Sequence, residues 1–215
     1  MKKYYLLIIV LTSLAWNSAF SSSDLDVKIS NEIDFIDVKH KGEVVRIQRN
    51  QSSDNIINPD YAKTSRKCPP FCIQPGKLAE GVETIGELEI LDYLVRMTKG
   101  DNSILVIDSR TEGWVKKGTI PGSTNIPWTL LKQEAGADPF QIAGILEDRF
   151  SAISIEGLWD FSNAKTLVLF CNGQWCGQSS SNIKTLLRFG YPAHKLKWYR
   201  GGMQNWESLG LTVVK

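Results

Sequence analysis

The chain has 215 residues, of which 42% are hydrophobic and 22% are charged. This is enough for one ordinary core and a small appendage, whereas two full domains would be tight. The formal charge of +2 disappears once Lys2 and Lys3 near the N-terminus are set aside, and no basic run is visible. A neutral chain without a basic stripe argues against nucleic acid as a partner.

The N-terminus has the layout of a secretory signal peptide. Lys2 and Lys3 precede an apolar run over residues 4–16, and small polar residues follow at 17–23. We predict a signal peptide at residues 1–22, and hence a periplasmic or secreted protein. The alternative is an uncleaved membrane anchor, because the apolar run is only just short of a membrane span. Contact with a membrane is expected only in that case.

Residues 23–83 form a polar N-terminal region. Two alternating segments at 33–38 and 44–47, separated by a turn, predict a β-hairpin. A linker-like stretch follows and leads to Cys68-Pro-Pro-Phe-Cys72 within residues 67–75, a proline-rich segment called the arm below. We expect the hairpin and the arm to precede the main domain at 84–215.

The four cysteines fall in two close pairs, Cys68 with Cys72 and Cys171 with Cys176. Disulfides are expected in an oxidising compartment, although four cysteines allow three pairings and the spacing does not choose among them. A zinc site at the arm would need two further ligands from the two histidines or the other cysteines. We therefore expect no metal ion and no other cofactor.

From residue 84 onward, helical patterns alternate with short buried strands, as in an α/β fold. Thr84-Ile-Gly-Glu87 has the pattern of a capping box, and apolar residues at helical spacing extend this predicted helix to Gly100. Continuous apolar runs predict buried strands at 104–110 and 166–170. Further expected elements are two short helices within 128–150 packing on the sheet, a strand at 196–199, a helix at 203–209 and a last strand at 211–214. The prediction is a parallel sheet flanked by helices.

The candidate site follows the strand at 166–170. Cys171 comes directly after the strand, and a helix follows that continues to Gly190; between them lies the loop Asn172, Gly173, Gln174, Trp175, Cys176, Gly177, Gln178 and Ser179. Backbone N–H groups in such a loop and the dipole of the following helix favour an anion. That anion is the thiolate of Cys171 or a group transferred onto it. A merely buried cysteine at a strand end would not require a glycine-containing loop.

Four landmarks occur in the order typical of the rhodanese family. They are Asp108-Ser-Arg110 after a strand, a Gly-Thr-Ile-Pro-Gly-Ser segment at 118–123, the unit of strand, Cys171, loop and helix, and a closing Gly-Gly-x-x-x-Trp pattern at 201–206. On these motifs residues 84–215 resemble a rhodanese-like domain. Thr119 departs from the histidine usual in the family, and the loop is about two residues longer than a usual sulfurtransferase loop. It also lacks the arginine that phosphatase relatives place at its end, which disfavours phosphatase activity.

The resemblance implies a sulfurtransferase in which Cys171 is the nucleophile and carries sulfane sulfur as a persulfide, and the predicted signal peptide places it in the periplasm. It would take sulfur from a small donor and pass it to a thiol acceptor, with a periplasmic protein as a further candidate partner. Asp108 and Arg110 are expected to support the site structurally, by pairing or by tying loops together. Trp175 is expected to cover the loop or to form part of a docking surface.

Cys176 leaves several alternatives open. It could form a disulfide with Cys171, resolve the Cys171 persulfide with release of sulfide, or pair with Cys68 or Cys72 and hold the arm over the site. A thiol–disulfide redox or sensing protein that uses Cys171 and Cys176 is therefore one alternative function. A non-catalytic module that binds a partner protein through the loop and the arm is another.

Overall fold

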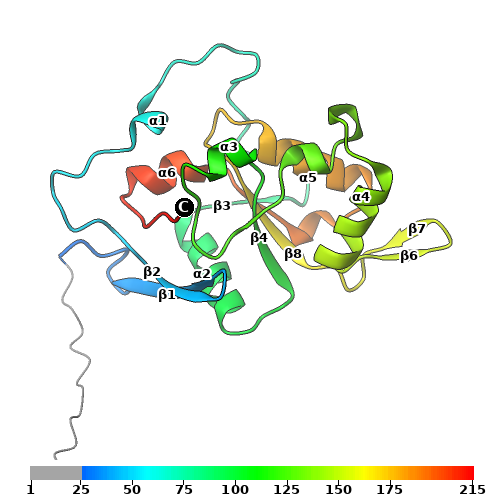
Figure 1. Cartoon of the computed structure of the whole chain (residues 1–215), viewed down its shortest axis with the longest axis horizontal. Helices are drawn as coiled ribbons and strands as arrows, with labels where there is room; N and C mark the ends of the chain where they lie inside the picture. Colours follow the sequence, from blue (N-terminus) through cyan, green and yellow to red (C-terminus); the bar gives the residue numbers. More distant parts are fainter. Residues whose placement is uncertain (1–25) are drawn as a thin grey trace, which may run out of the picture.

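The computed structural model describes residues 26–215, which form an α/β fold around a five-stranded sheet (Figure 1). All neighbouring strands are parallel, and their order is β3 (Glu83–Ile85), β9 (Leu196–Tyr199), β8 (Thr166–Phe170), β4 (Ile104–Asp108) and β5 (Thr124–Asn125). This confirms the predicted fold class. The predicted signal peptide lies outside the described residues.

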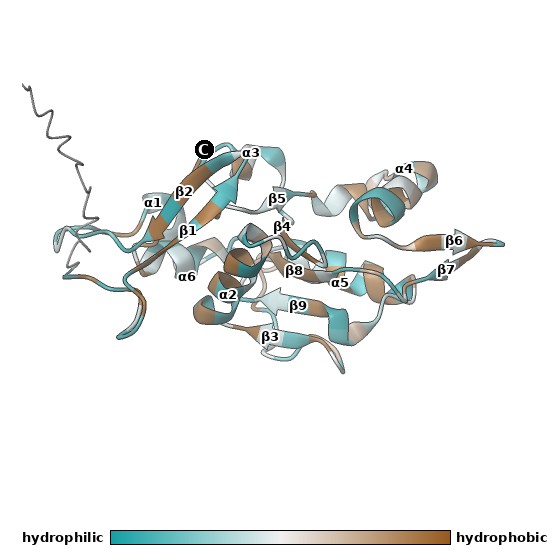
Figure 2. Cartoon of the chain, turned by 90° about the horizontal axis from the view of Figure 1, so that it is seen from below, coloured by the Kyte–Doolittle hydropathy of each residue, from teal (hydrophilic) through white to brown (hydrophobic). Residues whose placement is uncertain are grey.

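Helices cover both faces of the sheet, because the inner strands β4 and β8 are apolar on both sides. On one face, Leu105, Ile107, Leu167 and Leu169 share a core with α5 (Gln178–Arg188) and α4 (Pro139–Gly144). On the other face, Ile104, Val106, Val168 and Phe170 share a core with α2 (Glu87–Thr98) and α6 (Gly202–Ser208). Figure 2 shows these layers with their hydropathy.

The predicted hairpin consists of β1 (Phe35–His40) and β2 (Glu43–Gln48), which pair antiparallel. Lys41 and Gly42 connect them with φ angles of 51° and 89°, as a two-residue hairpin turn requires. Val38 and Ile47 are fully buried in the same core as Leu94 of α2. The hairpin therefore extends the core on this face of the molecule.

The start of α2 differs from the prediction. Thr84 and Ile85 belong to β3, where they pair with Trp198 and Tyr199 of β9. The helix begins at Glu87, and the N–H of Gly86 donates to Glu89 Oε2 at 2.9 Å. The predicted Thr84–Glu87 capping box is wrong because pairing with a distant strand draws Thr84 into the sheet, a tertiary contact that local pattern does not encode.

The segment between β5 and β8 is also less regular than predicted. It contains 3-10 helices at Trp128–Leu130 and Gln133–Ala135, then α4, then a π-helix at Ile145–Arg149. Asp138 caps α4 by accepting the N–H of Phe140 at 2.7 Å. The Phe140 side chain is 88% exposed and so does not pack on the sheet.

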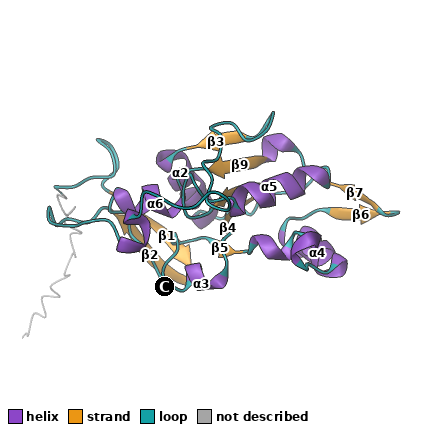
Figure 3. Cartoon of the chain, turned by 90° about the horizontal axis from the view of Figure 1, so that it is seen from above, coloured by secondary structure: helices purple, strands orange, loops and turns teal. Residues whose placement is uncertain are grey.

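The remaining elements are short. They are α1 (Pro59–Ala62), α3 (Glu112–Val115), the strands β6 (Ile153–Ile155) and β7 (Leu158–Asp160), and a 3-10 helix at Ala193–Lys195. The hairpin β6–β7 projects from the end of the molecule opposite β1–β2 (Figure 3). The strand predicted at 211–214 is wrong: this segment makes only two isolated bridges, Leu211 with Arg49 and Val214 with Thr119. No helix in residues 26–215 is both long and apolar enough to cross a bilayer.

Two neighbouring positions of α4 test which side of this helix supports the fold. Ile142 is 4% exposed in the core, whereas Phe140 points to solvent. We expect Ile142→Ala to lower the free energy of unfolding by about 2–5 kcal/mol through lost packing. Phe140→Ala, the control, should change it by no more than about 0.5 kcal/mol. Urea denaturation of both variants measures the difference, and equal effects would contradict the packing described here.

Candidate active site

The site lies at the carboxyl ends of the parallel strands, where loops from β4 and β8 meet. Cys171 directly follows β8, and the chain then forms a tight loop up to α5. Cys171 and Cys176 are joined by a disulfide, with their Cα atoms 6.3 Å apart. Both are buried, with exposed fractions of 2% and 4%. Of the alternatives for Cys176, the structure therefore has the bridge to Cys171.

The backbone of this loop is fixed by α6. The carbonyl oxygens of Cys171 and Asn172 accept the N–H groups of Met203 and Gln204, each at 2.9 Å. Gly202 makes this approach possible: its φ is +56°, and a Cβ there would collide with the Cys171 carbonyl oxygen. The sequence pattern marked this glycine only as part of a closing motif, without a role.

Helix α5 gives the loop a polar, buried end. It begins at Gln178, and its first turns contain the buried residues Ser179, Ser180 and Asn182. N–H groups in the first turn of a helix have no acceptor within the helix and favour negative charge nearby. The N–H of Cys176 donates to the Gly173 carbonyl at 2.9 Å instead. The N–H of Cys176 is therefore used within the loop, although it is one of the loop N–H groups expected from the sequence to favour an anion.

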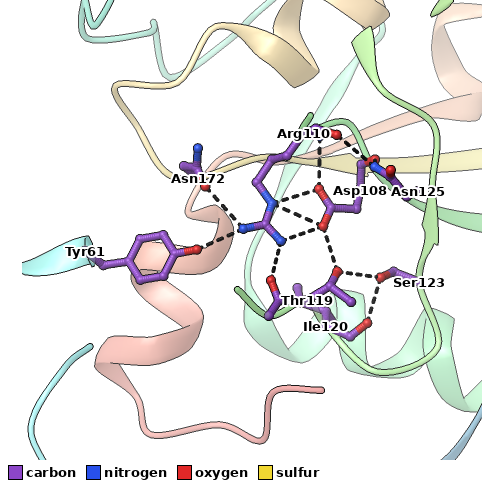
Figure 4. A network of polar contacts seen from close by, with 9 residues as sticks. Tyr61, Asp108, Arg110, Thr119, Ile120, Ser123, Asn125 and Asn172 are labelled. Atoms are coloured by element: carbon purple, nitrogen blue, oxygen red, sulfur yellow. Dashed lines mark hydrogen bonds and ion pairs between the residues drawn. The ribbon is translucent and has the colours of Figure 1, made fainter. Parts of the chain in front are cut away.

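Asp108 and Arg110 form a fully buried ion pair at the end of β4 (Figure 4). Arg110 Nε donates to both carboxylate oxygens of Asp108, at 2.9 and 3.1 Å, and Nη2 donates to Oδ2 at 2.6 Å. The Thr119 hydroxyl donates to the same Oδ2 at 2.7 Å. Thr119, the departure from the family pattern, thus has a defined role: it completes the hydrogen bonding of the buried carboxylate.

Arg110 also connects this pair to three other parts of the chain. It donates to the Gly118 carbonyl at 2.6 Å, to the Tyr61 hydroxyl at 2.8 Å and to Asn172 Oδ1 at 3.3 Å. Burial lowers the pKa of Arg110, but the hydrogen bonds and charge of Asp108, with a smaller contribution from Tyr61, outweigh burial and leave the pKa raised. Burial also raises the pKa of Tyr61 to about 12, against the opposing charge of Arg110. A permanently charged guanidinium thus holds Asn172, the residue next to Cys171.

The arm has its own disulfide, between Cys68 and Cys72. The alternative in which Cys176 pairs with Cys68 or Cys72 is therefore wrong for this structure. Hydrogen bonds hold the arm against the loop instead: Gln74 N donates to the Gln174 carbonyl at 2.8 Å, and Ser180 Oγ donates to Gln74 Oε1 at 3.0 Å. Arg200 donates to the carbonyls of Gln74 and Pro75, at 2.7 and 2.9 Å.

Trp175 forms the other contact between the loop and the arm. Its ring meets Phe71 edge-on at 5.7 Å between centroids, and the Arg66 guanidinium lies 4.0 Å from the ring centre. Its indole N–H donates to Gln204 Oε1 at 2.9 Å. Trp175 is therefore fixed between the arm and α6.

A cavity of about 660 Å³ opens beside this loop. Cys176 lines it together with Pro70 and Phe71 of the arm, three tryptophans and two lysines, Lys132 and Lys184. No histidine and no carboxylate of the described residues lines the cavity. The cavity wall therefore offers no imidazole or carboxylate as a base, and a thiolate here depends on backbone donors and positive charge. No cluster suited to a metal ion occurs within residues 26–215.

Sequence reasoning found Cys171, Cys176, the loop and the Asp108–Arg110 pair. It missed Tyr61, Gln74, Arg200 and Gln204, which tie distant segments to the site. The hydrogen bonds that tie them to the site join residues 29 to 143 positions apart along the chain. No local pattern marks such contacts.

Comparison with known families agrees with this geometry. The model of the rhodanese-like domain matches residues 91–209, which is more than half of the chain. The chain belongs to the rhodanese-like domain family. The match spans β4, β8, the candidate loop and the whole of α6.

Solved structures with this fold are similar at low sequence identity. A protein of Lactobacillus plantarum is 19% identical, with 61% of this chain and 87% of that chain covered and a TM-score of 0.41. The human single-domain sulfurtransferase TSTD1 is 19% identical, with 58% and 95% covered and a TM-score of 0.36. A Rhodopseudomonas palustris protein, described as a possible tyrosine phosphatase, is 19% identical, with 64% and 90% covered and a TM-score of 0.41. A search of curated proteins found no match.

The buried ion pair of this rhodanese-like domain can be tested by removing one partner. We expect Arg110→Met to lower the free energy of unfolding by about 3–5 kcal/mol, because it leaves the Asp108 carboxylate buried without its countercharge. The matched control is Lys77→Met, which removes an ion pair with Glu80 that is largely exposed and should cost less than about 1 kcal/mol. Urea unfolding measures both. A small effect at Arg110 would mean that the carboxylate is satisfied without it.

Proposed function

We propose that this protein is a sulfurtransferase that carries sulfane sulfur as a persulfide on Cys171. The observation that supports this most directly is the bond between Cys171 and Cys176 inside a loop of the rhodanese-like domain. It places a second sulfur within reach of Cys171, next to the N-terminus of α5. Membership of the rhodanese-like family supports sulfur transfer as the reaction. The second cysteine, Cys176, gives a way to release the sulfur from the Cys171 persulfide.

Loading begins with the reduced protein. The Cys171 thiolate attacks the outer sulfur of a donor such as thiosulfate, the donor S–S bond breaks, and sulfite leaves with the bonding electrons. The persulfide that forms on Cys171 is negatively charged. N–H groups in the first turn of α5, which have no acceptor within the helix, favour this negative charge, and the loop glycines allow the backbone to approach it closely.

Two exits from the persulfide are chemically balanced. An acceptor thiolate can attack the terminal sulfur, which transfers that sulfur and regenerates the Cys171 thiolate. Alternatively, the Cys176 thiolate attacks Cys171 Sγ, hydrosulfide leaves, and the Cys171–Cys176 disulfide of the structure forms. The second exit requires a dithiol reductant from outside the chain to return both cysteines to thiols.

The loop is less suited to phosphate. A bound phosphate dianion would favour a bidentate arginine at the end of the loop, and Gln178 and Ser179 occupy those positions. Arg110 is engaged with Asp108, Tyr61, Gly118 and Asn172. Sulfur transfer therefore fits these side chains better than phosphate-ester hydrolysis.

We also propose that the reaction takes place in the periplasm or outside the cell. The signal-peptide pattern at residues 1–22 and the two disulfides support this location, because disulfides form and persist in oxidising compartments. The cavity beside Cys176 gives a route for a small sulfur donor and a thiol acceptor. A periplasmic protein that supplies or accepts sulfur is a further proposed partner.

The same disulfide favours a second candidate function, a thiol–disulfide redox or sensing protein that uses Cys171 and Cys176. The two functions differ in whether an extra sulfur atom is ever carried. The redox potential of the pair tests this candidate, since a bridge that resists mild reductants would exclude it.

Transfer of persulfide sulfur to an acceptor would argue against a purely partner-binding module.

Variants of the two loop cysteines test the sulfurtransferase. We expect Cys171→Ser to reduce turnover of thiosulfate to the background rate, because the thiolate that attacks the donor and carries its sulfur is lost. Cys176→Ser should still load sulfur and should accumulate the Cys171 persulfide, because the internal attack is lost. The protein is reduced with a phosphine, freed from the phosphine and then exposed to thiosulfate, and intact-mass measurement detects the added sulfur.

Cys68→Ser serves as the control for the general loss of a cysteine, since Cys68 is exposed on the arm. The Cys68→Ser variant should form the persulfide on Cys171 to the same extent as the wild type. Unchanged turnover in Cys171→Ser would show that the mechanism is wrong.

A further inference from the structure

The two disulfides differ in how a reductant can reach them. Cys171 and Cys176 are 2% and 4% exposed, whereas Cys68 is exposed and Cys72 is half-buried. A protein dithiol must bring its own thiolate into line with a disulfide sulfur, so access limits the reaction. Such a reductant can approach Cys68 but not the buried pair.

The arm disulfide lies against the loop that contains the buried one. Gln74 Nε2 donates to the Cys72 carbonyl at 3.1 Å, and a Cβ placed on Gly177 would lie 3.9 Å from the same nitrogen. A single glutamine side chain thus separates Cys72 from the residue next to Cys176. Pro70, Phe71 and Cys176 also line the same cavity.

The cysteine-containing end of the arm has few buried contacts. Residues 67–71 are all exposed, while the anchored part begins at Gln74, whose N–H, side chain and carbonyl all have partners. Among these five exposed residues, Phe71 contacts the loop, through its ring on Trp175. A stretch with so few buried contacts can shift locally at a modest free-energy cost. Cys72 is placed between these two parts.

We propose that Cys68 and Cys72 relay electrons from an external protein dithiol to the Cys171–Cys176 disulfide. The inference rests on the proposed function, in which release of hydrosulfide leaves this disulfide to be reduced before the next cycle. It assigns a role to the arm, whose Cys-Pro-Pro-Phe-Cys sequence sulfur transfer does not otherwise use.

The relay begins at the exposed sulfur. A thiolate of the external dithiol attacks Cys68 Sγ, the Cys68–Cys72 bond breaks, and Cys72 leaves as a thiolate. The second thiol of the external protein then attacks its own sulfur in the mixed disulfide. This oxidises the external protein to its disulfide and frees Cys68 as a thiolate, so two electrons have entered the arm.

The second half passes these electrons inward. The Cys72 thiolate attacks Cys176 Sγ, which lines the cavity, and the Cys171–Cys176 bond breaks. Cys171 leaves as a thiolate beside the N-terminus of α5, where negative charge is favoured. Cys68 then attacks Cys72 Sγ, which restores the arm disulfide and releases Cys176 as a thiolate. The thiolate needed for sulfur loading is thus formed in place.

Reduction by two probes of different size tests the relay. Reduced thioredoxin serves as the protein dithiol and tris(2-carboxyethyl)phosphine as the small reductant, and alkylation followed by peptide mass mapping follows the Cys171–Cys176 bond. We expect thioredoxin to reduce this bond at least roughly tenfold more slowly in the double variant Cys68→Ser, Cys72→Ser than in the wild type. The phosphine should reduce both proteins at the same rate. Equal thioredoxin rates would overturn the relay.

A trapping experiment keeps the proposal falsifiable if the double variant perturbs the loop. Cys68→Ser with Cys171→Ser leaves Cys72 and Cys176 as the only thiols among the described residues. Mild oxidation should join them in a Cys72–Cys176 bridge. The matched pair Cys72→Ser with Cys171→Ser leaves Cys68 and Cys176, and should give much less bridge. Equal or absent bridging in both would overturn the inference.

The outcomes separate the relay from sulfur transfer. Persulfide loading of phosphine-reduced wild-type protein does not involve the arm disulfide, so it tests the proposed function alone. If loading succeeds and the relay tests fail, only the relay is wrong. If loading fails while thioredoxin reduces the buried bond through the arm, the redox candidate is favoured instead.

Discussion

Placing the Asp108 carboxylate and the Arg110 guanidinium together in the core costs several kcal/mol of desolvation for each ion. The fold offsets this cost by giving all five guanidinium N–H donors a partner. These partners come from the end of β4, from the turn at 118–119, from Tyr61 in α1 and from Asn172 in the loop. One buried charge therefore sets the relative position of four chain segments, and the candidate loop is one of them.

Around this fixed centre, the site divides into a rigid part and an accessible part. Hydrogen bonds from the first turn of α6 hold the loop, where Gly202 permits the close approach, and the two cysteines of the loop are buried. The arm is attached to it at Gln74 and Trp175 but exposes Cys68 to solvent. Such a division suits a reaction that needs an ordered, water-poor thiolate and also a route for electrons from a large partner.

The parts of the fold that were predicted correctly have strong local signals. Runs of apolar residues marked β4 and β8, and helical spacing marked α2 and α5. The edge strand β3 and the true start of α2 were missed, because three residues gain strand structure only by pairing with β9. The sequence did not indicate that α5 begins at Gln178, because the buried residues of its first turns are serines and an asparagine and so do not form an apolar helical pattern. Within the site, Thr119 donates to a carboxylate eleven residues away, a contact that composition does not indicate.

The hydrogen bonds that hold the arm against the rest of the protein involve mostly main-chain groups. The N–H of Gln74 and the carbonyls of Gln74, Pro75 and Gln174 form most of its hydrogen bonds to the rest of the protein. Main-chain groups are the same whatever the side chain, so most positions of the arm are free to drift in sequence without detaching it. Apart from Cys68 and Cys72, related proteins should therefore vary in this segment far more than in Arg200, whose guanidinium donates to its carbonyl groups, and the length of the arm should be kept more strictly than its composition.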